Sequence, residues 1–343
     1  MKILFGIQGT GNGHLSRARD VYPELAKYGE VDVLISGIQA DVSVSFPVKY
    51  KRYGMSFIFG KKGGVDIWDT VKKSDLVHLI KDIRELPVED YDLVINDFEP
   101  VSAWACKRKK LPCISLSHQC AVLNENAPQP EEEDRIGKLV LQRYAPVTAA
   151  YGFHFKAFAE NIFTPVIRKE IRAITPEDRG HYTVYLPAYD DATIVNHLSK
   201  FPGVKWEVFS KHNKEPFVSG NVSVQKIDNT AFVESMATST GVLCGAGFEG
   251  PAEAMYLGKK VLVIPMLAQY EQQCNAAGAV AMGATMIKTL DEKYHGSIRQ
   301  WLEEGKHLSV NYPDITAEIV EKIMSNHAPS YVSKNTQALG AGV

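Results

Sequence analysis

The sequence predicts an α/β protein in which two parallel-sheet domains face each other across a cleft. Three observations lead to this prediction. Short apolar runs alternate with helix-like stretches, a glycine-rich loop follows the first run, and a second alternation begins after proline-containing segments at residues 163–168 and 174–176. Strands that alternate with helices form parallel sheets covered by helices on both faces. The length of 343 residues suits two domains of ordinary size.

The first domain is expected to span residues 1–163. Runs rich in Val, Ile and Leu predict its strands, and apolar residues spaced three or four apart predict its helices. The expected strands are residues 2–8, 31–36, 93–96 and 113–116, with 49–59 extended, and the expected helices are 17–28, 67–85, 101–109 and 136–143.

The second domain is expected to span residues 164–327, and residues 328–343 are expected to be a flexible tail with little apolar content. The expected strands are residues 182–186, 206–209, 222–225, 242–244 and 261–264, and the expected helices are 232–237, 252–257 and 315–325.

Composition excludes several classes of function. Hydrophobic residues make up 45% and charged residues 23%, as in a water-soluble globular protein. The net charge of −2 argues against binding nucleic acid through bulk electrostatics. No apolar run approaches the ~20 residues of a membrane span, and the first residues read as a strand rather than a signal peptide. The five cysteines have neither a disulfide pattern nor zinc-site spacing, so we expect no metal and a cytoplasmic location.

Residues 241–276 carry the clearest sign of a ligand site. A short apolar run ends at a turn containing Gly245 and Gly247, a helix with Glu253 follows, and a β-branched run ends at Pro265. Ligands of open α/β sheets bind beyond the carboxyl ends of strands. The polar residues that follow this strand include Gln269, Glu271 and Gln272. Glycine lets backbone N–H groups approach a diphosphate at a helix start, and the carboxylate and amide groups suit ribose and sugar hydroxyls.

This segment resembles the donor-binding signature of GT-B glycosyltransferases, especially the peptidoglycan N-acetylglucosaminyltransferases and the UDP-glycosyltransferases. The likeness rests on Gly247, Glu253, Gly258 and Pro265, with Glu-Gln and Asn-Ala at residues 271–272 and 275–276. It extends over most of the chain and is greatest to a poorly characterised bacterial and archaeal branch. It implies two Rossmann-like domains, a last helix that crosses back onto the first domain, and a nucleotide-sugar donor, commonly a UDP-sugar, with no further cofactor.

The resemblance also implies roles for donor-site residues. Glu253 would hold the ribose, and Glu271 with Gln272 would hold the donor sugar. The diphosphate would lie near residues 245–250, where the expected donor contacts also include Phe248. The chain departs from the pattern at Lys260, where proline is usual.

The glycine-rich loop at residues 9–14 reads Gly-Thr-Gly-Asn-Gly-His. It lacks the GxGxxG spacing, and the second strand ends without a carboxylate, which makes a nicotinamide-dependent oxidoreductase improbable. The loop instead resembles the glycine loop and histidine of the same transferases. Its expected phosphate or acceptor contacts are Gly11, Asn12, Gly13 and, one turn further on, Arg17.

His14 is the candidate general base. The helix N-terminus is expected to keep its imidazole neutral and able to accept a proton near pH 7. Asp97, which follows a strand of the same sheet, is its expected orienting partner by resemblance to the UDP-glycosyltransferases, and Glu99 is the rival carboxylate. His118 ends the next strand and is expected to contact the donor or acceptor rather than catalyse.

The sequence-based hypothesis is therefore an inverting, metal-independent glycosyltransferase. The alternatives are a UDP-sugar 2-epimerase of the same fold and a non-catalytic nucleotide-sugar-binding protein. No motif identifies the acceptor, which is a glycan, a lipid-linked sugar or a small molecule. Aromatic and basic residues between Phe153 and Arg172 suggest peripheral contact with the inner face of the membrane, although such aromatics more often form a core strand and a linker.

Overall fold

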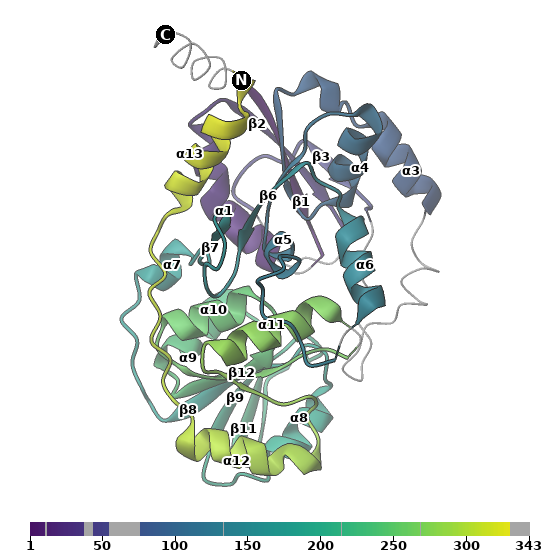
Figure 1. Cartoon of the computed structure of the whole chain (residues 1–343). Coiled ribbons are helices and arrows are strands. Elements are labelled where there is room, and N and C mark those ends of the chain that lie inside the picture. Colours follow the sequence, from purple (N-terminus) through teal and green to yellow (C-terminus); the bar gives the residue numbers. More distant parts are fainter. Residues whose placement is uncertain are drawn as a thin grey trace.

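A computed structural model describes residues 1–10, 12–37, 44–54, 76–132, 134–213, 215–267 and 269–329. The described residues form two seven-stranded sheets, one above the other in Figure 1. All strand pairs are parallel except that of β10 with β11.

The first sheet has the order β3-β2-β1-β4-β5-β6-β7. Its strands are β1 (Lys2–Gln8), β2 (Glu30–Ser36), β3 (Tyr50–Arg52), β4 (Leu93–Asp97), β5 (Ile114–Ser117), β6 (Ala149–Phe153) and β7 (Ile162–Phe163). The helices that accompany it are α1 (Asn12–Ala26), α3 (Leu76–Glu85), the 3-10 turn η1 (Val88–Asp90), α4 (Pro100–Lys109), α5 (His118–Val122) and α6 (Arg135–Tyr144), and α7 (Lys169–Arg172) follows in the linker.

The second sheet has the order β10-β11-β9-β8-β12-β13-β14. Its strands are β8 (His181–Tyr185), β9 (Lys205–Ser210), β10 (Phe217–Ser219), β11 (Val222–Lys226), β12 (Gly241–Gly245), β13 (Lys260–Ile264) and β14 (Thr285–Met286). Its helices are α8 (Asp191–Leu198), α9 (Asn229–Thr238), α10 (Glu249–Tyr256), α11 (Tyr270–Ala281), the 3-10 turn η2 (Glu292–Tyr294) and α12 (His295–Glu304), and α13 (Thr316–His327) ends the described chain.

Several contacts join the halves, among them a helix and a shared apolar cluster. Helix α13 packs along α1 of the first domain (Figure 1). At the end of α13, Asn326 and His327 contact the hydroxyl of Tyr151 in β6 at 3.0 Å each. One apolar cluster continues between the two sheets and includes Phe153 of β6 and Phe248 beside α10. Burial of a shared apolar surface holds the domains in contact. The residue limits predicted for the domains stay predictions.

The first helix begins earlier than the sequence pattern predicts. Helix α1 starts at Asn12 rather than at residue 17, so Gly13 and His14 belong to its first turn. Gly13 has no side chain that could contribute to an apolar pattern, and glycine has a low helix propensity. The first turn of this helix therefore gives no periodic signal in the sequence. Part of the expected helix at 67–85 and of the extended run at 49–59 lies outside the described residues.

Candidate active site

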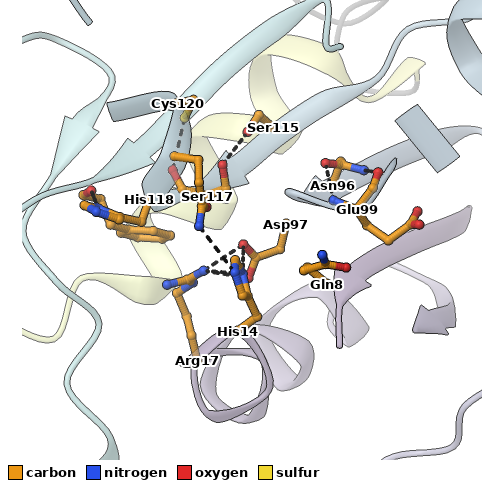
Figure 2. A network of polar contacts seen from close by, with 12 residues as sticks. Gln8, His14, Arg17, Asn96, Asp97, Glu99, Ser115, Ser117, His118 and Cys120 are labelled. Atoms are coloured by element: carbon orange, nitrogen blue, oxygen red, sulfur yellow. Dashed lines mark hydrogen bonds and ion pairs between the residues drawn. The ribbon is translucent and has the colours of Figure 1, made fainter. Parts of the chain in front are cut away.

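Four polar side chains of the first domain meet where it faces the second. Strands β1 and β4 are parallel neighbours, so both end at the same edge of the sheet. Helix α1 follows β1 and carries His14 and Arg17, while Asp97 is the last residue of β4. Gln119 lies in α5, directly after β5. Figure 2 shows His14 and Arg17 pointing towards Asp97.

His14 is hydrogen-bonded to Asp97 through one ring nitrogen. Its Nδ1 lies 2.9 Å from Asp97 Oδ1, and its Nε2 lies 3.3 Å from Gln119 Nε2. An ionised carboxylate only accepts hydrogen bonds, so the ring proton is assigned to Nδ1. Nε2 of the neutral ring is then the atom that accepts, from the Gln119 amide here or from a substrate hydroxyl.

The surroundings of His14 raise its pKa above the ordinary value. Burial disfavours the charged ring, but the charge and hydrogen bond of Asp97, helped by Glu249, outweigh burial and the opposing charge of Arg17. The direction of this shift is opposite to the effect expected of the helix N-terminus, because a full carboxylate charge exceeds the partial charge of a helix end.

The turn after β4 directs Asp97 and Glu99 to different partners. Phe98 has φ of 54°, a left-handed conformation that a bulky residue rarely adopts. On one side of it Asp97 is 1% exposed, and Arg17 and His14 overcome its burial and lower its pKa. On the other side Glu99 caps α4 by accepting from the N–H groups of Val101 and Ser102, each at 2.6 Å. Glu99 is thus committed to a helix cap.

Arg17 connects the two domains. Its Nη2 donates to both oxygens of Asp97, at 2.7 and 2.8 Å, and its Nη1 donates to Glu249 of the second domain. The Arg17 side chain is 3% exposed, whereas that of Glu249 is 25% exposed. Arg17 is therefore held by the buried Asp97 within its own domain and by the partly exposed Glu249 of the second domain.

The glycine turn of the second domain borders open space. An added Cβ at Gly247 or Gly250 would meet no atom within 4 Å, and one at Gly245 would meet only the Ile264 carbonyl, at 3.9 Å. Helix α10 begins here, and no side chain caps its first turn. Uncapped N–H groups at a helix start favour anions. On the facing loop, Asn12 and Gly13 lie in the first turn of α1, and Gly11 lies outside the described residues.

Glu253 is engaged by an arginine. It is 3% exposed, and its oxygens accept from Arg168 Nε at 2.6 Å and Nη2 at 2.7 Å. Burial outweighs this attraction and raises the pKa of Glu253. Each carboxylate oxygen has a second lone pair, so a ribose hydroxyl remains a possible further donor.

The residues expected at the donor sugar begin α11. Glu271 lies close enough to His14 and Gln119 to be influenced electrostatically by both, and its burial raises its pKa. Gln272 uses its oxygen to accept from the Met266 N–H at 2.9 Å. Gln269 has a buried side-chain oxygen without a partner among the described residues.

His118 and Phe248 lie against each other at the domain contact. Their rings stack with centroids 3.8 Å apart, and both residues are almost wholly buried. The His118 ring nitrogens lie 2.7 Å from the Phe153 carbonyl and 2.6 Å from Asn275 Oδ1, and burial lowers its pKa to about 4. Both residues therefore take part in contacts between the domains, and the ligand contacts expected of them stay predictions.

The aromatic segment expected at a membrane is largely core. Phe153, His154 and Phe155 are each at most 1% exposed. Within the described ranges, no helix is long and apolar enough to cross a membrane, and no group of three or more His, Cys, Asp or Glu side chains could hold a metal ion.

Three residues of this region were not predicted: Glu249, Gln119 and Arg168. Glu249 could have been found as a carboxylate in the first turn after a glycine loop, and Gln119 as the residue that follows His118 beyond a strand. Arg168 gave no local signal, since its partner is 85 residues away in the chain.

A family model described as "Glycosyl transferase family 1" matches residues 1–303. No curated protein matches the sequence significantly.

Solved structures resemble the chain over nearly its full length. A co-structure of S. aureus MnaA with UDP has a TM-score of 0.58 at 11% identity and covers 95% of this chain and 96% of its own. The glycotransferase of kitacinnamycin has a TM-score of 0.55 at 14% identity, with coverage of 98% and 97%. Arabidopsis thaliana UGT89C1 complexed with UDP has a TM-score of 0.54 at 13% identity, with coverage of 95% and 94%. At these identities the likeness concerns the fold, and it confirms the predicted GT-B arrangement of two Rossmann-like domains.

Proposed function

The chain belongs to glycosyl transferase family 1 and is a glycosyltransferase, and we propose that it transfers a sugar from a nucleotide-sugar to an acceptor hydroxyl with inversion and without a metal ion. Membership in a transferase family leaves the 2-epimerase and the non-catalytic binding protein without a supporting observation. The one observation that carries the mechanism is the 2.9 Å contact between His14 Nδ1 and Asp97, which leaves Nε2 as the acceptor of a proton.

The donor is proposed to bind on the second domain. Open space beside Gly247 and Gly250, together with the uncapped start of α10, suits a diphosphate. The sugar would then lie near Gln269, Glu271 and Gln272, and the ribose at the edge of Glu253. UDP is the first nucleotide to test, because two of the similar structures contain it.

The reaction follows from this placement. The acceptor hydroxyl donates its proton to His14 Nε2 while its oxygen attacks the anomeric carbon from the face opposite the diphosphate. A new glycosidic bond forms, the bond from carbon to diphosphate oxygen breaks, and the configuration inverts. Asp97 stabilises the resulting imidazolium. Arg17 and the N-terminus of α10 favour the negative charge on the leaving diphosphate, and contact between the domains excludes water that would compete with the acceptor.

The location is proposed to be the cytoplasm, with no cofactor beyond the sugar donor and no nucleic-acid partner.

The donor site is tested by thermal unfolding with UDP, dTDP, GDP and ADP. A ligand at 100 times its dissociation constant adds ~2.7 kcal/mol to the free energy of unfolding. One nucleoside diphosphate is expected to stabilise the parent protein but not Gly247→Val. An added Cβ at Gly247 meets no protein atom within 4 Å, so we expect the larger side chain to obstruct a ligand rather than the fold.

Gly203→Val is the matched control, because an added Cβ there also meets no atom and Gly203 lies in the turn before β9. Equal stabilisation of both variants by a nucleotide would contradict the proposed donor site. Absence of stabilisation by any nucleotide would contradict the proposed function.

A further inference from the structure

The ion pair between Arg17 and Glu249 connects the two domains at the place proposed for the diphosphate. Arg17 belongs to α1 of the first domain, and Glu249 is the first residue of α10 in the second. Asp97 holds the other side of the guanidinium with two hydrogen bonds. One end of this bridge is therefore fixed inside the first domain, and the other end reaches the glycine turn of the second.

The Glu249 carboxylate lies in surroundings that favour an anion. It is in the first turn of α10, and an added Cβ at Gly13, in the first turn of α1, would overlap it. Both helix starts attract negative charge, and Arg17 adds a full positive charge. The Nε of Arg17 is buried without a partner among the described residues, so the guanidinium keeps an unused donor.

The two carboxylates that hold Arg17 differ in how easily they can be replaced. Asp97 is 1% exposed and also bound by His14, whereas Glu249 is 25% exposed and lies beside the open space at Gly247 and Gly250. A diphosphate carries more negative charge than a carboxylate and presents several oxygens to a planar guanidinium. It can thus displace Glu249 from Arg17 while Asp97 remains in place.

We propose that Glu249 is an internal anion that occupies the diphosphate position and holds Arg17 across the domain contact until a donor diphosphate replaces it. This proposal rests on the proposed donor site and deepens it. In the resting protein the Arg17–Glu249 pair holds the domains together, and in the complex the diphosphate takes over that contact. Glu249 acts through Arg17 and is a positioning residue, since it touches none of the reacting atoms.

The proposal is tested by calorimetric titration of inorganic pyrophosphate and of UDP into the full chain. Glu249→Gln removes the competing charge at nearly constant volume, so it is expected to bind pyrophosphate about tenfold or more tightly than the parent. Glu249→Ala is a second variant that cannot hydrogen-bond Arg17, and it is expected to gain affinity as well. A structural role for Glu249 would instead leave affinity unchanged or lower it.

Glu132→Gln is the matched control. Glu132 pairs with Lys288 between the same two domains, but it is 87% exposed and far along the chain from both glycine loops. Glu132→Gln removes one negative charge and one ion pair between the domains, as Glu249→Gln does. The affinity of this control variant for pyrophosphate should equal that of the parent.

A double-mutant cycle separates exchange at Arg17 from general charge repulsion. Lysine at position 17 provides one ammonium group in place of a guanidinium that reaches both carboxylates. In the Arg17→Lys background, Glu249→Gln is expected to gain much less affinity than in the parent. An equal gain in both backgrounds would overturn the exchange.

The outcomes also distinguish this proposal from the proposed function. Binding of UDP to the parent with no gain in either Glu249 variant overturns the exchange and leaves the donor site standing. Failure of UDP and pyrophosphate to bind any variant overturns both.

Discussion

The two sides of the domain contact differ in how closely their polar groups are surrounded by other protein atoms. On the first-domain side, His14, Arg17 and Asp97 form a buried network in which each side chain contacts the other two. On the second-domain side, added Cβ atoms at Gly247 and Gly250 meet no atom within 4 Å, so the glycine turn borders open space. Chemistry requires groups fixed before the substrate arrives, whereas binding requires groups that a ligand can satisfy. The difference supports our proposal that the first side transfers the proton and the second side binds the donor.

The largest expected effect is that of His14→Ala, which should lower the rate of transfer but not the affinity for the nucleotide. His14→Ala removes the proposed base, so the transfer rate should fall ~10²–10⁴-fold. The nucleotide affinity should stay near that of the parent, because the ring lies on the first-domain side. The measurement is the turnover number beside the dissociation constant of the nucleotide. His307→Ala, at an exposed histidine bonded to the Gly258 carbonyl, serves as the control and should change neither quantity.

A second comparison concerns the two arginine–glutamate pairs. The side chains of Arg168 and Glu253 are 9% and 5% exposed. Glu253→Ala removes two hydrogen bonds from this buried guanidinium, which keeps Glu170 and Asn229 as partners, and it should lower the free energy of unfolding by ~3 kcal/mol. Glu249→Gln breaks a partly exposed pair and should cost no more than ~1 kcal/mol. Urea titrations of both variants measure the two losses. Equal losses would remove the distinction between a fixed pair and an exchangeable one.

The pH dependence tests the coupling of His14 to Asp97. A base with a raised pKa loses activity as pH falls through that pKa, so we expect the acid limb of kcat/KM above the ordinary pKa of a histidine. Asp97→Asn removes the strongest influence that raises this pKa, which moves the acid limb to lower pH while the plateau rate falls. Asp32→Asn, in the partly exposed pair with Lys49, is the control. An acid limb that stays in place in Asp97→Asn would show that Asp97 does not act through the ring.

The smallest expected effect has the opposite sign. The Gln119 amide donates towards His14 Nε2 and so favours the neutral ring. Gln119→Ala should therefore raise the pKa of His14 slightly, and an NMR titration of the ring protons measures it. A fall in this pKa would mean that the amide does not donate to Nε2.

Local patterns predicted much of the fold and the first-domain side of the site. Alternating strands and helices indicated two parallel sheets. Asp97 was expected beside His14 because both follow strands of one sheet and because the resemblance to UDP-glycosyltransferases implies such a pair. The start of α1 was missed because Gly13 carries no apolar signal. The pattern of apolar residues along the sequence does not show which surfaces of two domains contact each other. The Arg17–Glu249 ion pair and the stacking of His118 on Phe248 were therefore not predicted.

Calorimetric titration of one nucleoside diphosphate into His14→Ala and Gly247→Val, with donor turnover measured on the same samples, tests the division of tasks most directly. The account predicts that His14→Ala binds the nucleotide like the parent but turns over the donor ~10²–10⁴-fold more slowly. It predicts that Gly247→Val loses nucleotide binding. Loss of binding in His14→Ala, or parental binding in Gly247→Val, would contradict it.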